Sequence, residues 1–391
     1  MKKSYKIIND PVHGFINIPS GLIQEIIEHP YFQRLRDIKQ LGMTNLVYPG
    51  ATHSRLLHAL GAMHLMKEAI DALRNKGIEI DASEEEASMC AMLLHDIGHG
   101  PFSHALENNL LVGISHEEIS LAMMKAINKE KNNALAKTIE IFEDKYPKHF
   151  LHQLVSSQLD VDRLDYLRRD SFFSGVAEGM IGHERIIKML NVHDNSLVVE
   201  EKGIYSVEKF LISRRLMFWQ VYLHKTVIAA EQLLIQILRR ARELTQSSVK
   251  LQGSPAIFFF MRNKFSEDDL DDRSIIDKFA MLDDNDFISA IKQWQYCDDK
   301  ILSLLSRNLS MRRLPKIILS SEPINPELCT GEDYLVQCGE VVNEGYDIEG
   351  EFIGIISKDG IVKNIYDISD MLSAKAFSQV TKKYFLCTAR L

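Results

Sequence analysis

Residues 92–100 read Met-Leu-Leu-His-Asp-Ile-Gly-His-Gly and place His95 beside Asp96 at the end of an apolar segment. Ser83 and Glu86 form a capping-box pattern, which predicts that a helix begins there. The glycines after Asp96 predict that the helix ends near them. Because the residues in between are apolar on most faces, we expect this helix to be buried. Asp96 would then be a charge in an apolar setting, at the negative end of the helix dipole.

Two interpretations of the His95-Asp96 pair follow from these residues. A divalent cation would compensate the buried carboxylate, and an imidazole with a carboxylate suits a metal that takes nitrogen and oxygen ligands. The alternative is a buried hydrogen bond between the two side chains that only fastens the helix end. The cost of burying a charge favours the metal, and both interpretations stay open at this point.

The composition is that of an ordinary soluble globular protein. The chain has 391 residues, of which 46% are hydrophobic and 26% are charged, enough for a large core and more than one structural unit. The net charge of −8, from 46 basic and 54 acidic residues, argues against a nucleic-acid binder that relies on bulk positive charge. It leaves room for a local basic pocket that binds phosphates.

Targeting signals and cysteine spacing favour the cytoplasm. The first residues lack the apolar region of a secretory signal, and no apolar run approaches the roughly 20 residues of a membrane span. We therefore expect no membrane partner. The five cysteines show no paired spacing, which fits a reducing compartment and argues against a zinc finger. They are Cys90, Cys297, Cys329, Cys338 and Cys387.

Helical periodicity dominates the chain from residue 22 to residue 313. We expect helices at residues 20–41, 55–76, 83–97, 116–128, 134–142, 152–169, 181–190, 206–244 and 286–306. One short hairpin is predicted among them, with strands at 196–200 and 204–205 around a turn at 201–203.

The composition shifts near residue 314, where several prolines and serines predict a linker. The period after the linker is typical of strands, expected at residues 334–342, 352–357, 361–366 and 384–389. The predicted fold is therefore mostly α, with a helical core at residues 1–313 that contains a short β-hairpin. A linker and a small α+β unit follow at residues 314–391.

A second segment that bears on the pair begins the helix predicted after residue 54. Arg55 and His58 lie three residues apart, so they share a face of that helix. The alternative for His58 is an ordinary histidine of a first helical turn. Further along, His104, Glu107 and His116 follow the His95-Asp96 segment, and histidines there are candidates for proton transfer. Their alternative is a set of loop and surface residues.

A third segment combines carboxylates with a tyrosine. Asp162, Tyr166 and Asp170 are spaced i, i+4 and i+8, so they lie on one helical face. Asp165 and Arg169 can form an ion pair at i and i+4 on another face. The alternative is a solvated charged face, against which the tyrosine argues.

The order His58, His95-Asp96, Asp162 resembles the H…HD…D arrangement of the HD-domain phosphohydrolases. The flanking sequences resemble, within them, the deoxynucleoside triphosphate triphosphohydrolases of the branch that contains the sterile-alpha-motif and HD-domain protein and its bacterial relatives. The resemblance extends from Asn9 to about Lys225. It is carried by NDPVHG at 9–14, FQRLR at 32–36, KQLG at 39–42, YPGA at 48–51, HDIGHGPFSH at 95–104 and DVDRLDY at 160–166.

The resemblance implies an HD-domain helical core and one divalent metal per subunit, held by His58, His95, Asp96 and Asp162. Two nitrogens and two oxygens suit Mn²⁺, Fe²⁺ or Mg²⁺, and Zn²⁺, Ni²⁺ or Co²⁺ could be captured in purification. Such a metal lowers the pKa of a bound water and polarises a phosphate. The implied reaction converts a dNTP to a deoxynucleoside and inorganic triphosphate.

The resemblance also implies the residues that would bind the substrate. Arg55, Arg163 and Arg214 would hold the phosphates, for which guanidinium groups are suited, although lysine is usual at position 163. The catalytic histidine would be His104, supported by His116. Glu107 would orient them, and it stands where the family can carry aspartate.

Sugar recognition is implied in the same way. Gln40 and Asp170 would bind the 3′-hydroxyl, Tyr166 would pack on the sugar, and Leu41 and Tyr222 would crowd the 2′ position against ribonucleotides. The family makes few contacts with the base, so we expect low base specificity.

A regulatory guanine-nucleotide site between the subunits of a homo-oligomer, a dimer or tetramer, is the last implication. The residues concerned are Lys6, Ile7, Asn9, Glu28, Gln33, Arg36 and Lys225. Glu28 replaces an aspartate of the family, and Phe218 and Gln220 depart from its polar or basic pattern. The alternative for the N-terminal motif is a purely structural turn.

The function that we expect is therefore a cytoplasmic, metal-dependent dNTP triphosphohydrolase, activated by a guanine nucleotide. One alternative is an HD phosphohydrolase of another nucleotide, such as a ribonucleotide, a monophosphate or an alarmone. Another is a nucleotide-sensing or nucleic-acid-binding protein with weak activity.

Overall fold

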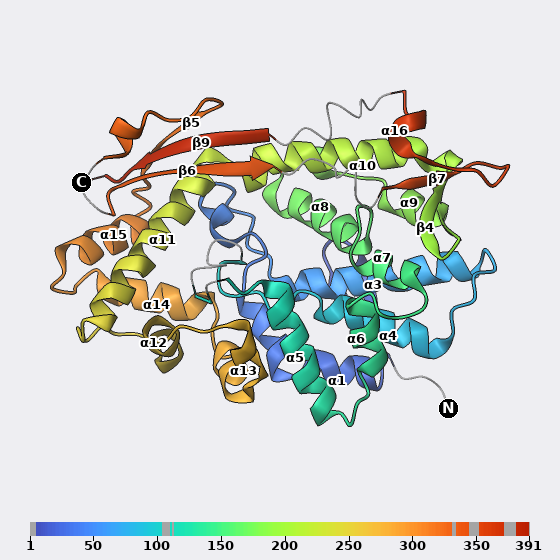
Figure 1. Ribbon diagram of the computed structural model, residues 1–391, viewed down its shortest axis with the longest axis horizontal. Helices are drawn as coiled ribbons and strands as arrows, with labels where there is room; N and C mark the ends of the chain where they lie inside the picture. The colour runs from blue at the N-terminus through green and yellow to red at the C-terminus, as the bar shows by residue number, and fades with distance from the viewer. Residues whose placement is uncertain are drawn as a thin grey trace.

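The structure, a computed structural model, describes residues 5–103, 110–111, 113–330, 334–343, 352–370 and 381–390. It is mostly α-helical, as the sequence predicts, with small sheets at its edges (Figure 1). Three helices meet at the centre: α3 (Arg55–Arg74), α4 (Ala82–Leu94) and α8 (Val161–Ser174). Both α4 and α8 pack on α3, which brings together segments that are far apart in the sequence.

Helix α4 begins at Ala82 because Asp81 caps it. The Asp81 carboxylate accepts hydrogen bonds from the backbone N–H groups of Ser83 and Glu84, and the Glu84 carboxylate accepts one from the backbone N–H of Asp81. This is a capping box, but its residues are not Ser83 and Glu86, so that detail of the prediction is wrong. The helix is buried from residue 87 to its end, as expected.

The N-terminal segment differs from the single helix predicted at residues 20–41. Pro30 begins a new helix there, because proline lacks the N–H that would continue the preceding one. An antiparallel hairpin that the sequence analysis missed comes first, formed by β1 (Tyr5–Asp10) and β2 (Gly14–Pro19). The helical pieces are α1 (Leu22–Glu28), α2 (Pro30–Gln33), and the turns η1 (Arg34–Asp37) and η2 (Gly42–Leu46).

The helix predicted at residues 152–169 is also two helices. The chain between them is not helical, and the Asp160 carboxylate caps α8 by accepting a hydrogen bond from the backbone N–H of Arg163. The helices around this break are α5 (His116–Glu130), α6 (Ala136–Phe142), α7 (His149–Val155) and α9 (His183–Met189), with a 3₁₀ turn η4 (Ala177–Gly179).

The long helix predicted at residues 206–244 is interrupted near its middle. It consists of α10 (Ile204–Met217), a π-helical turn η6 (Phe218–Tyr222) and α11 (Lys225–Gln246). The side chain of His224 accepts a hydrogen bond from the backbone N–H of Thr226 and so caps α11. Phe218 and Tyr222, at the two ends of η6, line a cavity.

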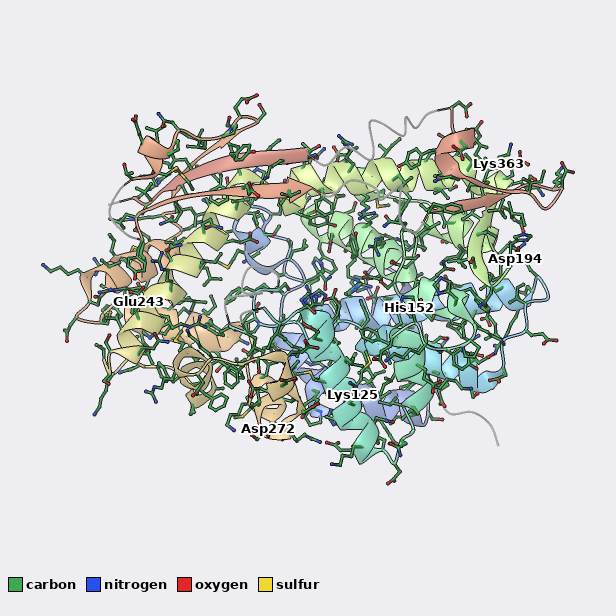
Figure 2. All side chains as sticks on the ribbon, viewed as in Figure 1. Lys125, His152, Asp194, Glu243, Asp272 and Lys363 are labelled. Carbon is green, nitrogen blue, oxygen red and sulfur yellow. A yellow bond between two sulfur atoms is a disulfide. The ribbon has the colours of Figure 1, made fainter. Side chains whose placement is uncertain are left out.

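The hairpin predicted around residues 201–203 is wrong in its second strand. β4 (Ser196–Glu200) pairs instead with the preceding β3 (Leu190–His193). Asp194 and Asn195 form the turn with positive φ values, and Asp194 lies at its tip on the edge of the molecule (Figure 2). Residues 201–203 are a 3₁₀ turn, η5 (Glu201–Gly203), that leads into α10.

The C-terminal part of the chain adds helices and two sheets. The helices are α12 (Pro255–Arg262), α13 (Arg273–Phe279), α14 (Asp284–Trp294), α15 (Lys300–Ser310) and α16 (Ile365–Ile368), with the turns η7 (Glu267–Asp271) and η8 (Pro326–Cys329). Those at residues 255–279 escaped the sequence analysis.

Strands that follow residue 314 divide between two sheets. β9 (Thr381–Thr388) lies between β5 (Lys316–Ser320) and β6 (Val336–Asn343), and this sheet runs over α11 (Figure 1). β7 (Gly354–Ile356) pairs in parallel with β4 and antiparallel with β8 (Val362–Asn364). The predicted linker therefore contains a strand, and the domain boundary at residue 314 stays a prediction.

One apolar core extends through the helices and includes Ile355 of β7 and the neighbouring Ile353. Among the described helices, none is long and apolar enough to cross a membrane. Cys329 and Cys338 form a disulfide, so the expectation of unpaired cysteines is wrong for these two. Cys90, Cys297 and Cys387 are free.

Candidate metal centre

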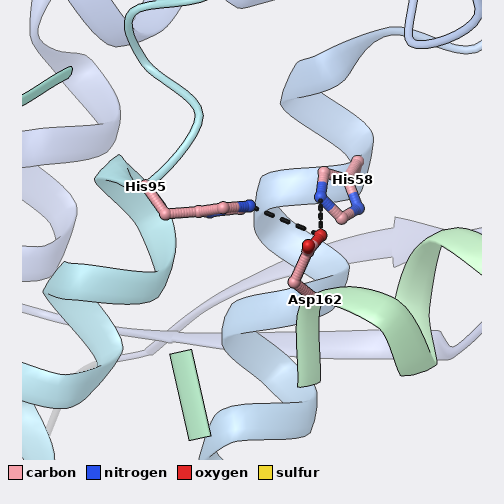
Figure 3. Close-up of side chains that lie close together, drawn as sticks. All are labelled: His58, His95 and Asp162. Atoms are coloured by element: carbon pink, nitrogen blue, oxygen red, sulfur yellow. Dashed lines mark ion pairs between the residues drawn. The ribbon is translucent and has the colours of Figure 1, made fainter. Parts of the chain in front are cut away.

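The four predicted metal ligands meet where α3, the end of α4 and the start of α8 converge. His58 lies in the first turn of α3, His95 and Asp96 directly follow α4, and Asp162 is the second residue of α8. Figure 3 shows His58, His95 and Asp162 pointing toward one another.

The distances between the four side chains are those of a ligand shell. Asp162 Oδ1 lies 3.0 Å from His58 Nε2 and 3.5 Å from His95 Nε2. Asp96 Oδ1 lies 3.3 Å from His95 Nε2, and Asp96 Oδ2 lies 3.8 Å from His58 Nε2. Both Nε2 atoms are buried without a hydrogen bond of normal geometry to any described residue. His58, His95 and Asp162 each offer a ligand atom close enough to the other two to hold one divalent cation. Asp96 groups in the same way with His99 and His116, so its role as the fourth ligand stays a prediction.

The outward nitrogens of both histidines are held by acceptors. His58 Nδ1 lies 2.8 Å from Asp165 Oδ2, and His95 Nδ1 lies 2.7 Å from the backbone oxygen of Met92. Each Nδ1 therefore carries the proton and donates it, which leaves Nε2 free to bind a metal. The arrangement is the usual outer support of a histidine ligand.

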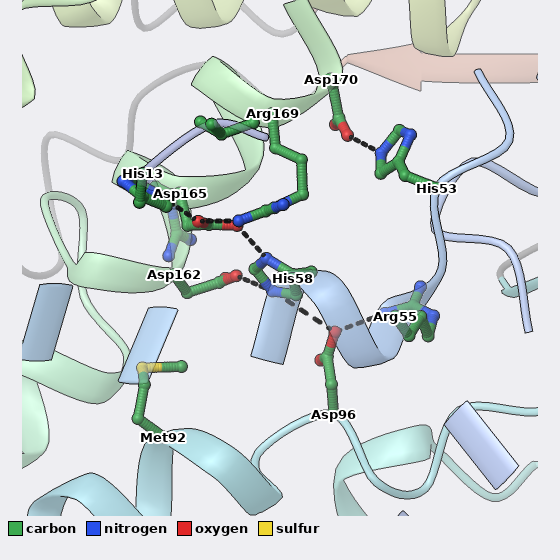
Figure 4. Close-up of polar contacts among 12 residues, drawn as sticks. His13, His53, Arg55, His58, Met92, Asp96, Asp162, Asp165, Arg169 and Asp170 are labelled. Atoms are coloured by element: carbon green, nitrogen blue, oxygen red, sulfur yellow. Dashed lines mark hydrogen bonds and ion pairs between the residues drawn. The ribbon is translucent and has the colours of Figure 1, made fainter. Parts of the chain in front are cut away.

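Asp165 is the centre of a buried ionic network that positions His58 (Figure 4). His13 Nε2 lies 2.6 Å from Asp165 Oδ1, and Arg169 Nε donates to Asp165 Oδ2 at 2.8 Å. Arg169 Nη1 also donates to Asp10 Oδ2 at 2.8 Å. Burial raises the pKa of Asp165, but Arg169 and the two histidines outweigh it and hold that pKa well below its usual range.

The network needs the space beside Gly61 in α3. A Cβ at Gly61 would lie 2.1 Å from Arg169 Nη2 and 2.2 Å from Asp165 Oδ1. The predicted pairing of Asp165 with Arg169 is confirmed. The alternative of a solvated charged face is wrong for these two, because neither side chain is exposed.

Asp96 has partners beyond the metal position. Arg55 Nη1 donates a hydrogen bond to Asp96 Oδ2, and His99 Nε2 lies 3.3 Å from Asp96 Oδ1. Burial raises the pKa of Asp96, but His95 and His99 outweigh it and hold that pKa well below the usual range. The His99 ring stacks on that of His116, with centroids 3.8 Å apart. His99 was missed from the sequence, although its position three residues after Asp96 signals a shared turn.

The metal position opens into a cavity of about 510 Å³. Its lining combines two of the predicted metal ligands with all five residues predicted to recognise a sugar. They are Gln40, Leu41, Gly42, Thr44, Arg55, Asp96, His99, Phe102, Ser103, His116, Asp162, Tyr166, Asp170, Phe218, Tyr222, Leu223 and Glu231.

The sugar-recognition candidates in this cavity are held by one another. Tyr222 donates a hydrogen bond from its hydroxyl to Asp170 Oδ2 at 2.8 Å. His53 Nε2 lies 2.8 Å from the other oxygen of Asp170. Tyr166 and Tyr222 meet edge to face, with ring centroids 6.2 Å apart. Asp162, Tyr166 and Asp170 line one cavity, as their spacing predicts.

Other predicted site residues lie outside this lining. Arg163 forms an ion pair with Asp160, and Arg214 donates a hydrogen bond to Gln158 Oε1 at 3.2 Å. Neither is among the residues that line the cavity, so their contact with phosphate stays a prediction. His104 and Glu107 lie outside the described residues.

The predicted regulatory residues form two groups. Lys6 donates a hydrogen bond to Glu28 Oε1 at 2.5 Å, and Arg36 donates one to Gln33 Oε1 at 3.0 Å. Lys225 lies instead in the lining of a separate cavity of about 650 Å³. Three further cationic side chains line that cavity: Arg312, Lys316 and Arg390.

The chain is similar to known proteins over most of its length. The family model described as the HD domain matches residues 55–170, and that of the HD-associated region matches residues 181–269. The crystal structure of a phosphohydrolase from Bacteroides thetaiotaomicron is 51% identical, with a TM-score of 0.95, and the match covers 99% of this chain and 100% of that one.

Several curated proteins are similar to this chain, two of which follow. The protein YwfO of Bacillus subtilis, described as uncharacterized, is 34% identical over 79% of this chain and 71% of its own length. A protein of Dictyostelium discoideum, described as a deoxynucleoside triphosphate triphosphohydrolase SAMHD1 homolog, is 32% identical over 64% of this chain. The match spans about half of that relative, 52% of its length.

Proposed function

The chain belongs to the HD-domain family of phosphohydrolases, and on that premise we propose that it cleaves dNTPs to a deoxynucleoside and inorganic triphosphate. One observation carries the proposal. A single cavity is lined both by the metal ligands Asp96 and Asp162 and by Leu41 and Tyr222, which are suited to exclude a 2′-hydroxyl. A metal-activated water and a deoxyribose would thus occupy the same site.

The chain supplies the groups that this reaction needs. A divalent cation held by the four ligands would lower the pKa of a bound water and polarise a phosphate oxygen. Arg55, which lines the cavity beside Asp96, would neutralise phosphate charge. His116 also lines the cavity. By the resemblance, His104 and His116 would deliver the proton that the departing 5′-oxygen takes up.

Sugar selection would depend on other residues of the same lining. Asp170 accepts hydrogen bonds from both His53 and Tyr222, so its carboxylate is fixed in place before a sugar arrives. We assign the 3′-hydroxyl to Asp170 and Gln40. The ring of Tyr222 and the side chain of Leu41 would then leave no room for a ribose 2′-hydroxyl.

The test is a product-resolved assay with Mn²⁺ and each dNTP, with and without added dGTP. Release of inorganic triphosphate is expected. Release of pyrophosphate or single phosphates would indicate another HD phosphohydrolase chemistry. No turnover with any divalent metal would favour the alternative of a nucleotide sensor. Equal rates with rATP and dATP would remove the role of Leu41 and Tyr222.

We further propose activation by a guanine nucleotide bound between subunits. The support is the division of the regulatory residues between two places. Lys6, Glu28, Gln33 and Arg36 pair near the N-terminal hairpin, whereas Lys225 belongs to a cavity with three other cations. A nucleotide that needs both groups would require a second subunit. Light scattering with and without dGTP tests this, because a larger assembly is expected with the nucleotide.

A cytoplasmic location fits an enzyme whose substrates are dNTPs. The Cys329–Cys338 disulfide bears on this location, because disulfides are rare in a reducing cytoplasm. Mass measurement of the protein taken directly from cells, with thiols blocked, would give its oxidation state there.

A further inference from the structure

Glu231 places a carboxyl in the wall of the substrate cavity without any described partner. It lies in the second turn of α11 and is only partly buried, because its side chain faces the cavity. Among the described residues, no hydrogen bond or ion pair to its carboxyl is found, and burial with no compensating charge raises the pKa of Glu231 to about 7.

The other carboxylates of the cavity are all accounted for. Asp96 is bound by Arg55, Asp170 is bound by His53 and Tyr222, and Asp162 belongs to the metal centre. A carboxyl that is removed from water without a partner costs free energy. A bound ligand that donates hydrogen bonds would remove that cost.

The position of Glu231 identifies the part of the substrate that it would meet. α11 packs against η2, α12, α15 and β5, whereas the metal ligands come from α3, α8 and the turn after α4. Tyr222, at the sugar position, ends the turn η6 directly before α11. A nucleotide with its phosphates at the metal and its sugar at Tyr222 would extend its base toward α11.

We propose that Glu231 is a base-specificity residue that binds the Watson–Crick edge of guanine, which makes dGTP the preferred substrate. The inference rests on the proposed function. Above pH 7 Glu231 is an ionised carboxylate with two acceptor oxygens, and guanine presents two neighbouring donors, N1–H and the N2 amino group, so the substrates are compared at pH 8. This assignment departs from the low base specificity expected from the sequence.

The same chemistry ranks the other bases. Adenine and cytosine present one amino donor next to an acceptor nitrogen, so they match the carboxylate with one hydrogen bond. Thymine presents its single N3–H between two carbonyl oxygens, which repel a carboxylate. The expected order of kcat/KM is dGTP first, then dATP and dCTP, and dTTP last.

The experiment compares wild type with Glu231→Gln for all four dNTPs, measured separately. A fixed GTP concentration in every assay makes any effector response the same for all substrates. A bidentate contact with a base discriminates by about 1–3 kcal/mol, which is roughly a 5- to 150-fold ratio. We expect the preference for dGTP over dTTP to fall by about tenfold or more, mainly through a higher KM for dGTP.

Glu243→Gln is the matched control, because it removes a carboxylate from the same helix outside the cavity lining. It should leave the order of the four substrates unchanged. An unchanged order in Glu231→Gln, with normal turnover, would overturn the inference while the proposed function stands.

Equilibrium binding of dGTP and dTTP, measured with Ca²⁺ as the divalent cation, distinguishes failure of the proposed function from failure of the Glu231 assignment. If the wild type releases no triphosphate, the proposed function fails. A loss of dGTP binding in Glu231→Gln, with dTTP binding retained, would still support the assignment of Glu231. Equal binding of both nucleotides by wild type and variant would overturn it.

Discussion

The two ends of the substrate cavity differ in how completely their polar groups are paired. At the metal end, Asp165 alone binds His13, His58 and Arg169, and each histidine predicted to bind the metal has its outer nitrogen held. At the α11 end, Glu231 has no described partner. The metal end is therefore organised before any substrate binds, whereas the α11 end requires a substrate to complete it. On the proposed function, the hydrolysis step would take place at the metal end, and the nucleotide base would be selected at the α11 end.

Removing a predicted metal ligand should have the largest effect on metal content and turnover. Asp162→Ala deletes the carboxylate that approaches both His58 and His95, so we expect loss of bound metal and turnover below detection. Metal content by mass spectrometry and triphosphate release measure the two effects. Glu243→Gln should retain both. Retained metal in Asp162→Ala would show that the fourth ligand is another residue.

Removing the support of a ligand should have the next largest effect. Asp165→Asn leaves the four ligands in place but weakens the hold on His58, and such supporting contacts are worth about 10- to 100-fold in metal affinity. Titration with a chelator below the unfolding temperature measures it. Thermal unfolding in parallel separates lost stability from lost affinity. An unchanged metal affinity would mean that packing alone orients His58.

At the α11 end, the free energy of unfolding should fall as the pH rises. A carboxylate in an ion pair would instead lose its stabilising effect as the pH falls. Because burial raises the pKa of Glu231 to about 7, the folded protein binds a proton that the unfolded chain, with a pKa of about 4.3, has released. The contribution of protonated Glu231 to the free energy of unfolding is complete below about pH 4 and is lost as the pH rises through 7.

The Glu231→Gln variant tests that sign. It should unfold at a higher temperature than wild type at pH 8, by about 2–4 °C, with a smaller difference at pH 5. Thermal unfolding followed by circular dichroism at both values measures it. A wild type that is more stable than the variant at pH 8 would show that Glu231 has a cationic partner.

The smallest effect is expected where the two ends meet. Tyr222→Phe keeps the aromatic ring but removes the hydrogen bond to Asp170, so it should raise KM for dATP by about 3- to 10-fold. Hydrolysis of rATP should stay as slow as in wild type, because the ring remains. A gain in rATP hydrolysis would show that the hydroxyl of Tyr222, and not its ring, excludes ribose.

The sequence predicted the metal end better than the surrounding architecture. The order of His58, His95, Asp96 and Asp162 is a weak pattern by itself, and the flanking motifs make the resemblance to the HD-domain family specific. The outer support was less visible, since His13 reaches Asp165 only through the fold. The spacing of Asp165 and Arg169 predicted their pair, but not its burial.

Helix interruptions and strand pairing were the main errors. Apolar positions continue at helical spacing through Pro30, residues 156–160 and His224, where a cap or a missing N–H ends the helix. The partner of β4 was mistaken because the turn that matters is Asp194-Asn195, before the strand. Glu231 gave no local signal, because one carboxylate on an amphipathic helix is usually solvated.

Gly61 gives the metal end an unusual mutational profile. Glycine in a helix interior costs about 1 kcal/mol relative to alanine, so alanine there would ordinarily stabilise α3. A single methyl group at this position would instead collide with Arg169 and Asp165. In a saturation library, residue 61 should be as intolerant as the ligands, although it touches neither metal nor nucleotide. Residue 61 is thus restricted to glycine by the charged side chains that already fill the space beside it.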